Sequence, residues 1–286
     1  MKTTLWIAFL SITLATASCG NKKTTGTDGP GGPNNTEEIE LKINLTKGKK
    51  YDMKMALNSN AEMNMMGQSI NTITNMEMGM DYEVMDVLPS GNFLVRTTYK
   101  TIKMSGESMG MKYEYDSETG KGTGPQGEQM ATSMKKIIGE YSDMEMDKNG
   151  KIVKTTMSSG LSDGKDKGGF NNINYSVFPD KKVKVGDTWD SDIEQTMNKL
   201  VAIIKTKYTL TAVKDGMADI AMDGTLDIKP GSTGKITGTQ KGTGKIEIAT
   251  GMSKEVVMDQ DIEMEVDQMG MKMPMKMKNK VTITVN

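Results

Sequence analysis

The sequence of 286 residues contains no histidine, one cysteine and few aromatic residues, which make up 5% of the chain. Without histidine there can be no Ser–His or Cys–His catalytic pair and no imidazole ligand for zinc or haem. One cysteine cannot form an intramolecular disulfide. The formal net charge of -1 provides no basic surface for nucleic acid or for an anionic membrane. We therefore expect a protein that is not an enzyme, holds no cofactor or metal and binds no nucleic acid.

The first 18 residues have the layout of a secretory signal peptide. Lys2 supplies a positive charge, and the apolar run from Leu5 to Ala17 is shorter than the about 20 residues of a membrane-spanning helix. The run ends in Thr16-Ala17-Ser18-Cys19-Gly20. Small residues that lead into a cysteine resemble the lipobox of bacterial lipoproteins. We expect Cys19 to become the acylated N-terminus of the mature chain, with ordinary cleavage after Ala17 as the alternative.

Residues 19–36 are expected to form a flexible tether between the lipidated Cys19 and a β-rich domain at 37–286. They are rich in Gly, Thr, Asn, Lys and Pro and lack large apolar side chains, so they cannot bury enough surface to order themselves. Several acyl chains anchor a protein stably, because each buried CH₂ contributes about 0.8 kcal/mol. Gly20 is not the acidic residue that keeps some lipoproteins on an inner membrane. We therefore expect an outer-membrane location that faces the periplasm.

Apolar and polar residues alternate through most of residues 37–286, which is the pattern of half-buried strands. In the first predicted hairpin one face carries a row of methionines, namely Met53, Met55, Met76, Met78 and Met80. A turn at 66–69 that pairs Met65 with Ile70 would place Met55 opposite Met80 and Met53 opposite Tyr82.

The last predicted hairpin contains two independent patterns that agree on one register. Its first strand carries acidic residues at alternate positions, namely Asp259, Asp261, Glu263, Glu265 and Asp267. Its second strand carries Lys272, Lys276, Lys278 and Lys280 in alternation with Met273, Met275 and Met277. If Asp267 faces Lys272, the charges form a ladder on one face and Met264 meets Met275 on the other. A slip by one residue would lose both patterns, and the facing lysines argue against Ca²⁺ at the acidic row.

One helix and several turns complete the expected secondary structure. Residues 126–141 carry an apolar stripe at spacings of three and four, formed by Met130, Met134, Ile137, Ile138 and Tyr141. Turns are expected at 89–92 and 148–150, and a long mobile loop at 157–172. The predicted fold class is mostly β, a large curved antiparallel sheet or incomplete barrel with one helix around 126–141.

Three landmarks recur in the same order and indicate two related β units, at about 41–124 and 183–286. The matched pairs are Gly48-Lys49-Lys50-Tyr51-Asp52 with Gly186-Asp187-Thr188-Trp189-Asp190, Tyr82 to Gly91 with Tyr208 to Gly216, and Tyr113-Glu114-Tyr115 with Ile246-Glu247-Ile248. Chance recurrence of Gly, Thr and alternating residues in an all-β chain is the alternative explanation.

The least generic stretch is Val183 to Trp189, preceded by Phe178-Pro179. Together with the Leu45 to Tyr51 opening and Cys19, it resembles a family of uncharacterised bacterial envelope lipoproteins that is known as a domain of unknown function. The likeness spans most of Leu41 to Val285. More distantly, the expected sheet is similar to the lipoprotein-localisation-factor fold, an incomplete barrel that shelters acyl chains. The family has no established catalytic set, so the resemblance implies no functional residues.

Methionine is the most unusual component, with 29 residues, many of them in M-x-M patterns. Methionines two apart on a strand project to the same face, and thioethers suit Cu(I). Flexible, polarisable side chains also fit variable apolar partners. An ordinary core, a lipid or other apolar ligand site and a Cu(I) site therefore all stay open. The candidate ligand-binding residues are Met53, Met55, Met76, Met78, Met80, Met264, Met273, Met275 and Met277.

These patterns together predict a lipid-anchored protein of the bacterial cell envelope that acts as a non-enzymatic binding or structural module. Its expected partners are the membrane, through Cys19, and an apolar ligand or an envelope protein. We expect the Met-lined face of the 53–84 and 259–285 hairpins to shelter that ligand, provided the helix at 126–141 does not fill it. A periplasmic Cu(I)-binding protein is the alternative function.

Overall fold

The computed structural model describes residues 37–65, 68–125, 127–161, 178–197, 200–232, 234–268 and 271–286. The predicted signal peptide, Cys19 and the tether lie outside the described residues, as do residues 162–172 of the predicted loop. No helix within the described ranges is long and apolar enough to cross a membrane.

Within the described ranges the chain is 68% strand, with one helix and a single antiparallel sheet of thirteen strands. The first seven strands are β1 (Lys50–Met65), β2 (Gln68–Val87), β3 (Phe93–Ser108), β4 (Met111–Asp116), β5 (Lys121–Thr123), β6 (Tyr141–Met146) and β7 (Ile152–Met157). The others are β8 (Thr188–Met197), β9 (Leu200–Lys214), β10 (Met217–Ile228), β11 (Ile236–Glu247), β12 (Met252–Gln268) and β13 (Met271–Val285). The helix α1 spans Gly127–Met134.

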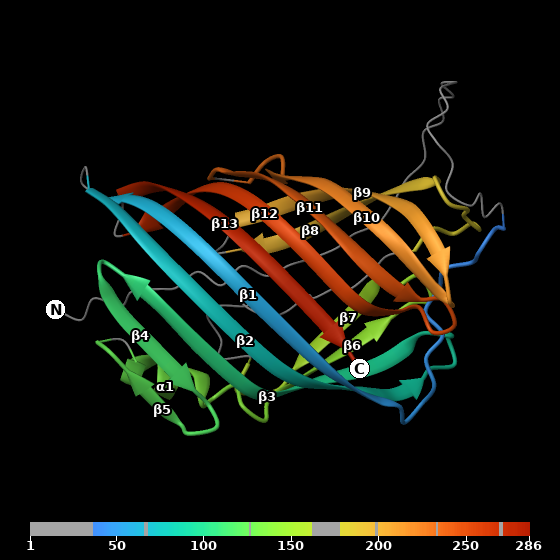
Figure 1. The fold of residues 1–286 in the computed structure, drawn as a ribbon, viewed down its shortest axis with the longest axis horizontal. Helices are drawn as coiled ribbons and strands as arrows, with labels where there is room; N and C mark the ends of the chain where they lie inside the picture. Colours follow the sequence, from blue (N-terminus) through green and yellow to red (C-terminus); the bar gives the residue numbers. More distant parts are fainter. Residues whose placement is uncertain are drawn as a thin grey trace.

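The sheet is large, curved and open, which confirms the predicted fold class (Figure 1). Its strand order is β5-β4-β3-β2-β1-β13-β12-β11-β10-β9-β8, and β6 pairs with β3 and β7 beside this path. The first and last long strands therefore lie next to each other in the middle of the sheet, with Met53 opposite Val285.

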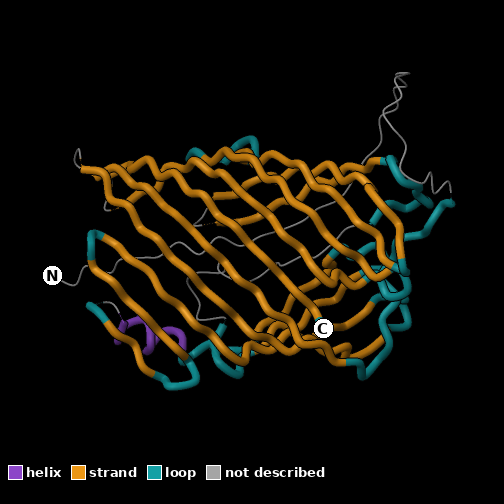
Figure 2. Tube along the Cα trace, viewed as in Figure 1, coloured by secondary structure: helices purple, strands orange, loops and turns teal. Residues whose placement is uncertain are grey.

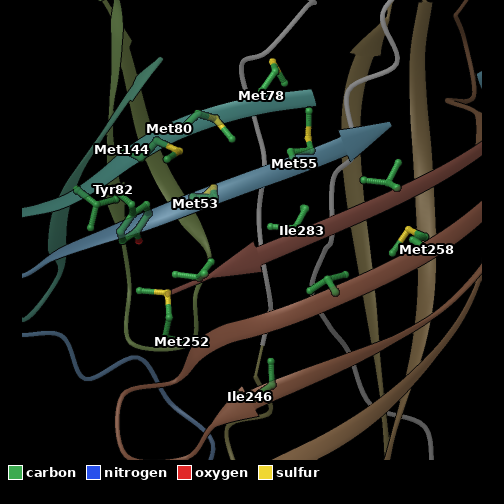
Figure 3. Close-up of a cluster of buried hydrophobic side chains, with 14 of the residues drawn as sticks. Met53, Met55, Met78, Met80, Tyr82, Met144, Ile246, Met252, Met258 and Ile283 are labelled. Atoms are coloured by element: carbon green, nitrogen blue, oxygen red, sulfur yellow. The ribbon is translucent and has the colours of Figure 1, made fainter. Parts of the chain in front are cut away.

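One face of the sheet, the inner face, is apolar and buried, whereas the outer face carries the charges. Burial alternates along β2 without a break from Thr74 to Val84. Figure 3 shows side chains of β1 and β2, including Met53 and Met78, on the same face as Ile283 and Met258 from β13 and β12. The period of two along each strand thus places the apolar side chains of neighbouring strands on one face of the sheet.

Residues 37–49 close one end of the sheet, on the right in Figure 1. The backbone N–H of Ile43 donates to Lys148 O at 2.7 Å, and that of Asn44 donates to Thr250 O at 2.9 Å. Ile39 forms an isolated antiparallel β-bridge with Val183, in which each backbone N–H donates to the other residue's carbonyl oxygen. One segment therefore joins the β6–β7 turn, the β11–β12 turn and residues before β8, where Figure 2 shows many of the loops gathered.

The predicted register of the last hairpin is confirmed. Asp267 faces Lys272 and Met264 faces Met275 along the backbone. On the outer face, Lys276 Nζ lies 2.8 Å from Glu263 Oε1. These side chains are exposed, so the pair specifies the register more than it stabilises the fold.

The predicted register of the first hairpin is wrong by two residues. β1 ends at Met65 and β2 begins at Gln68, so Met65 faces Gln68 and Met55 faces Met78. A shift of two residues preserves the face of every side chain. The apolar face therefore forms as expected although its cross-strand partners differ.

The helix is shorter than predicted. α1 ends at Met134, and residues 135–139 form turns in which Ile137 N–H donates to Met134 O at 3.0 Å. Gly139 has a φ of 85°, a conformation that favours glycine, and Tyr141 belongs to β6, opposite Thr98. Tyr141, the last residue of the predicted apolar stripe, therefore belongs to a strand and not to the helix. The turns expected at 89–92 and 148–150 lie between β2 and β3 and between β6 and β7.

Arg96, the sole arginine of the chain, fastens β6 to β3. Its Nε donates to Asp143 Oδ1 at 2.7 Å and its Nη2 donates to Oδ2 at 2.8 Å. Its Cζ also lies 3.8 Å from the ring centroid of Tyr141. Both charged side chains are partly buried, with exposed fractions of 31% and 21%. A planar guanidinium can make these contacts together, whereas an ammonium cannot.

We expect Arg96→Lys to lower the free energy of unfolding by about 1–2 kcal/mol, because it loses the two-pronged hydrogen bond and the ring contact. Urea unfolding of the full chain measures this. The control is Lys100→Gln, which removes an exposed ion pair with Asp81 and should cost at most about 0.5 kcal/mol. Equal losses for both variants would show that β6 is not held in this way.

Candidate functional site

All nine methionines predicted as candidate ligand residues are buried on the inner face. The structure divides them between two apolar clusters. Met53, Met55, Met76, Met78 and Met80 belong to the first cluster. Met264, Met275 and Met277 belong to the second, and Met273 lies two residues beyond Met275 on the same face of β13.

The first cluster, here called the capped cluster, is covered by segments outside the main sheet. Leu41, Ile43 and Leu45 pack into it from residues 37–49, and Phe178 and Val183 pack into it from the segment before β8. These side chains share one buried cluster with the first five methionines. The five methionines predicted as ligand residues on this side thus lie in a cluster that segments outside the main sheet also join.

The helix α1 does not lie over the centre of the sheet. It packs against β4 and β5 at one edge, and its Met130 and Met134 join the capped cluster from there. The main contacts of the helix are thus with β4 and β5 and not with the central strands that carry the predicted methionines.

The second cluster, here called the distal cluster, lies at the end of the sheet opposite residues 37–49. Its buried members are Ala202, Ile204, Leu226, Ile236, Ile262, Met264, Met275 and Met277, with Ala61, Met63 and Ile228 partly buried beside them. Each of these described residues belongs to a strand of the sheet. The distal cluster is thus a concave apolar wall built by six adjacent strands.

Three methionines of the distal cluster form a row across neighbouring strands. Met63 on β1 faces Met275 on β13, and Met275 faces Met264 on β12. Facing Cα atoms in antiparallel strands are about 4.5–5.5 Å apart. Three thioethers are therefore neighbours on one surface.

A line of polar and small residues separates the two clusters. It runs straight across ten strands, one residue per strand, and each member faces the next in the register: Tyr113, Gly106, Thr74, Ser59, Asn279, Gln260, Gln240, Gly224, Thr206 and Ser191. We call this line the polar row. On the side of the row that leads to the capped cluster, each of these strands carries apolar side chains on its inner face. The polar row is therefore a narrow band within an apolar interior.

Two glycines let long side chains reach across a strand within the polar row. Tyr113 Oη on β4 passes over Gly106 on β3 and lies 2.8 Å from Thr74 Oγ1 on β2. A Cβ at position 106 would overlap the Tyr113 hydroxyl. Burial raises the pKa of Tyr113, so its hydroxyl stays protonated and able to donate.

The same device recurs in the other half of the sheet. Gln240 Nε2 on β11 passes over Gly224 on β10 and donates to Thr206 Oγ1 on β9 at 2.8 Å. A Cβ at position 224 would lie 3.0 Å from Gln240 Cγ and 2.6 Å from Lys205 O. Glycine is therefore required at both positions for the hydrogen bonds to form.

Two side chains in the middle of the polar row have polar atoms without a hydrogen-bond partner among the described residues. Gln260 Nε2 donates to Gln240 Oε1 at 3.3 Å, but Gln260 Oε1 has no hydrogen-bond partner among the described residues. Asn279 faces Gln260 on the next strand, and its Nδ2 also has no such partner. The two side chains are only 5% and 4% exposed. An unused acceptor and an unused donor are thus buried side by side.

The polar row was not predicted from the sequence, although one signal for it was present. Gln260 interrupts the apolar positions between Met258 and Ile262, and Asn279 interrupts those between Met277 and Val281. The predicted register of this hairpin already placed the two interruptions opposite each other. The other eight members come from strands whose pairing the sequence did not specify.

A hollow of about 390 Å³ lies at the outer face. It is lined by Asn58, Asn60, Ile73, Asn75, Asp259, Asp261, Lys278 and Lys280, together with Ser59, Gln260 and Asn279 of the polar row. Its charges offset each other, since Lys278 Nζ lies 3.6 Å from Asp261 Oδ1. Across the described ranges, no group of three or more Asp, Glu, Cys or His residues could hold a metal ion.

A family model matches residues 90–164 and 153–253, which together span more than half of the sequence. The model describes DUF6263, a family of unknown function. The chain belongs to this family. Comparison with curated proteins finds no match for this DUF6263 chain.

Two solved structures match the DUF6263 chain. A lipovitellin structure, "Lipid-protein interactions in lipovitellin", matches with a TM-score of 0.51 and 8% identity, over 85% of this chain. The chain spans only 25% of that lipovitellin chain. The translocator domain of the autotransporter NalP from Neisseria meningitidis matches with a TM-score of 0.32 and 6% identity, over 84% of this chain and 89% of that one. At 8% identity the likeness to lipovitellin concerns the fold alone.

We expect Gly224→Ala to lower the free energy of unfolding by about 1–3 kcal/mol, because the added methyl group collides with Lys205 O and displaces Gln240. Gly244→Ala is the matched control. It lies on the inner face of the neighbouring strand, and the nearest atom to its Cβ would be 3.8 Å away. That change should be neutral or slightly stabilising in urea unfolding. A similar loss in the two variants would contradict the packing described for the polar row.

Proposed function

We propose that this protein is a lipid-anchored, non-enzymatic binding protein of the bacterial cell envelope that shelters an apolar ligand or lipid. The observation that carries the proposal is the distal cluster, a concave apolar wall whose described members all belong to the sheet. A wall of this kind on an open sheet can accept an acyl chain without breaking backbone hydrogen bonds. The similar fold of lipovitellin, a protein whose structure was described for its lipid–protein interactions, supports the same proposal.

The residue types of the wall suit a ligand of variable shape. Met63, Met264, Met275 and Met277 contribute unbranched, polarisable side chains to it. Such side chains adapt to irregular apolar partners at low cost, as at other promiscuous binding surfaces. Burying an acyl chain there would contribute about 25 cal/mol for each Å² of apolar surface removed from water.

The location rests on the N-terminal sequence. Acylation of Cys19 would anchor the chain to the outer membrane, and residues 19–36 would hold the sheet at a distance from the bilayer. The membrane, an apolar ligand and an envelope protein are thus the proposed partners. A periplasm-facing domain would meet lipids or acylated proteins in transit.

The test is native mass spectrometry of the full chain, isolated from a bacterial envelope in mild detergent. We expect bound lipid masses on the folded protein. The same sample after denaturation should lack residues 1–18 and carry acyl chains at Cys19. A folded protein without bound lipid would contradict the sheltering function. An unmodified Cys19 would independently contradict the lipid anchor.

A matched pair of variants locates the ligand. Met264→Ser with Met275→Ser makes the distal cluster polar, and bound lipid should fall about tenfold because apolar surface is lost from the wall. Lys276→Ser changes the outer face of the same strand and should leave lipid binding unchanged. If both variants retain the lipid, it binds elsewhere.

The row of three neighbouring methionines favours one second candidate, a Cu(I) site. Met63, Met275 and Met264 supply three soft thioether ligands on adjacent strands. This candidate requires the thioethers themselves, whereas lipid binding requires only an apolar surface.

Replacing all three of these methionines by leucine separates the candidates. The apolar surface is retained, so bound lipid should persist, whereas a Cu(I) adduct formed by the wild-type chain should disappear. Cu(I) titration followed by native mass spectrometry measures both. A copper adduct that persists in the leucine variant would exclude this row as the copper site.

A further inference from the structure

We propose that Gln260 and Asn279 bind the polar group of an uncharged lipid that offers both a hydrogen-bond donor and an acceptor, while its acyl chain lies on the distal cluster. The inference rests on the proposed sheltering function and specifies its ligand. A monoacylglycerol, with an ester carbonyl and free hydroxyl groups, has the required chemistry.

The ligand group must supply a donor and an acceptor together. Gln260 Oε1 can accept a hydrogen bond, and Asn279 Nδ2 can donate one, yet neither has a partner among the described residues. The two residues face each other on β12 and β13. Leaving such atoms unpaired in a buried place is unfavourable, so a ligand that pairs both gains affinity.

The ligand group must also be uncharged. The polar row consists of Ser, Thr, Asn, Gln, Tyr and Gly residues and contains no charged side chain. A phosphate or carboxylate at Gln260 would be buried without a counter-ion, which costs far more than burying a hydroxyl or an ester. The row thus selects against phospholipids and ionised fatty acids.

The direction of the acyl chain follows from the two clusters. On one side of Gln260 lies the capped cluster, which Leu41 and Ile43 join from outside the main sheet. On the other side the distal cluster consists of strand residues alone among the part of the chain that the structure describes. From Asn279 to Met273 the inner face of β13 runs for about 20 Å. One acyl chain spans half of a bilayer core that is about 30 Å thick, so this length is sufficient.

The hydrogen bonds beside the pair prepare it for binding. Gln260 is held in place by its bond to Gln240, which is itself held by Thr206 across Gly224. Its acceptor therefore needs little reorganisation when a ligand arrives, which favours affinity. The polar group would sit at the centre of the sheet, where β12 and β13 meet.

The experiment compares three probes that share a C18 chain on the full-length protein: monooleoylglycerol, methyl oleate and octadecene. Methyl oleate offers an acceptor only, and octadecene offers neither group. Native mass spectrometry in competition mode should show at least about tenfold preference for monooleoylglycerol over methyl oleate. Weaker or equal binding of monooleoylglycerol would overturn the proposal.

The variant Gln260→Met with Asn279→Leu removes both amides at similar volume and should abolish the preference while octadecene still binds. Asn58→Leu with Asn75→Leu is the matched control, because these residues face each other on the outer face of β1 and β2. It should keep the preference. If the double inner variant does not fold, each single substitution should reduce the preference by severalfold.

The outcomes separate the two levels of inference. If no probe binds, the sheltering function itself fails. If all three bind equally, or if the inner variant keeps the preference, sheltering stands and the polar row is only a structural element.

Discussion

Cross-strand register is the constraint on which the rest of the structure depends, because a slip of one residue would turn methionines outward and charges inward. The polar row shows how far this register extends. Its members come from ten strands, and each member faces the next directly. In the order of the sheet from β4 through β1 and β13 to β8, a shift of any one strand along its axis would break the row. The row therefore marks one level at which the apolar interior is divided into a covered core and a distal wall.

The parts of the fold that could be predicted are those in which two patterns agree. In the β12–β13 hairpin, acidic residues opposite lysines and Met264 opposite Met275 specified a single register. In the β1–β2 hairpin, methionines recur at every second position on both strands, so a shift of two residues is invisible in the pattern. The helix was predicted too long because its apolar stripe continues beyond Gly139 into residues that pair with β3.

The sequence pointed to methionine as the residue type of the candidate site, but it did not predict that these methionines lie in two separate clusters. Met53 and Met275 look alike in the sequence, yet Met53 lies in the capped cluster with side chains from residues 37–49 and Met275 lies in the distal cluster. The polar row is a property of many strands together. The two units at 41–124 and 183–286 stay a prediction, although β1–β4 and β8–β11 each contribute a serine, a threonine, a glycine and a long polar side chain to the row in the same order.

The position of the C-terminal strand has a consequence for biogenesis. β13 lies between β1 and β12, so the middle of the sheet is completed by Met271–Val285, which follow β1 by most of the length of the sheet's sequence. Until they arrive, β1 and β12 each present an unpaired edge and an apolar face, the combination that promotes aggregation. Contacts between strands that lie far apart in the sequence also make folding slow. The middle of the sheet can therefore form only after β13 has been synthesised, and a nascent chain of this kind would need protection by a chaperone until then.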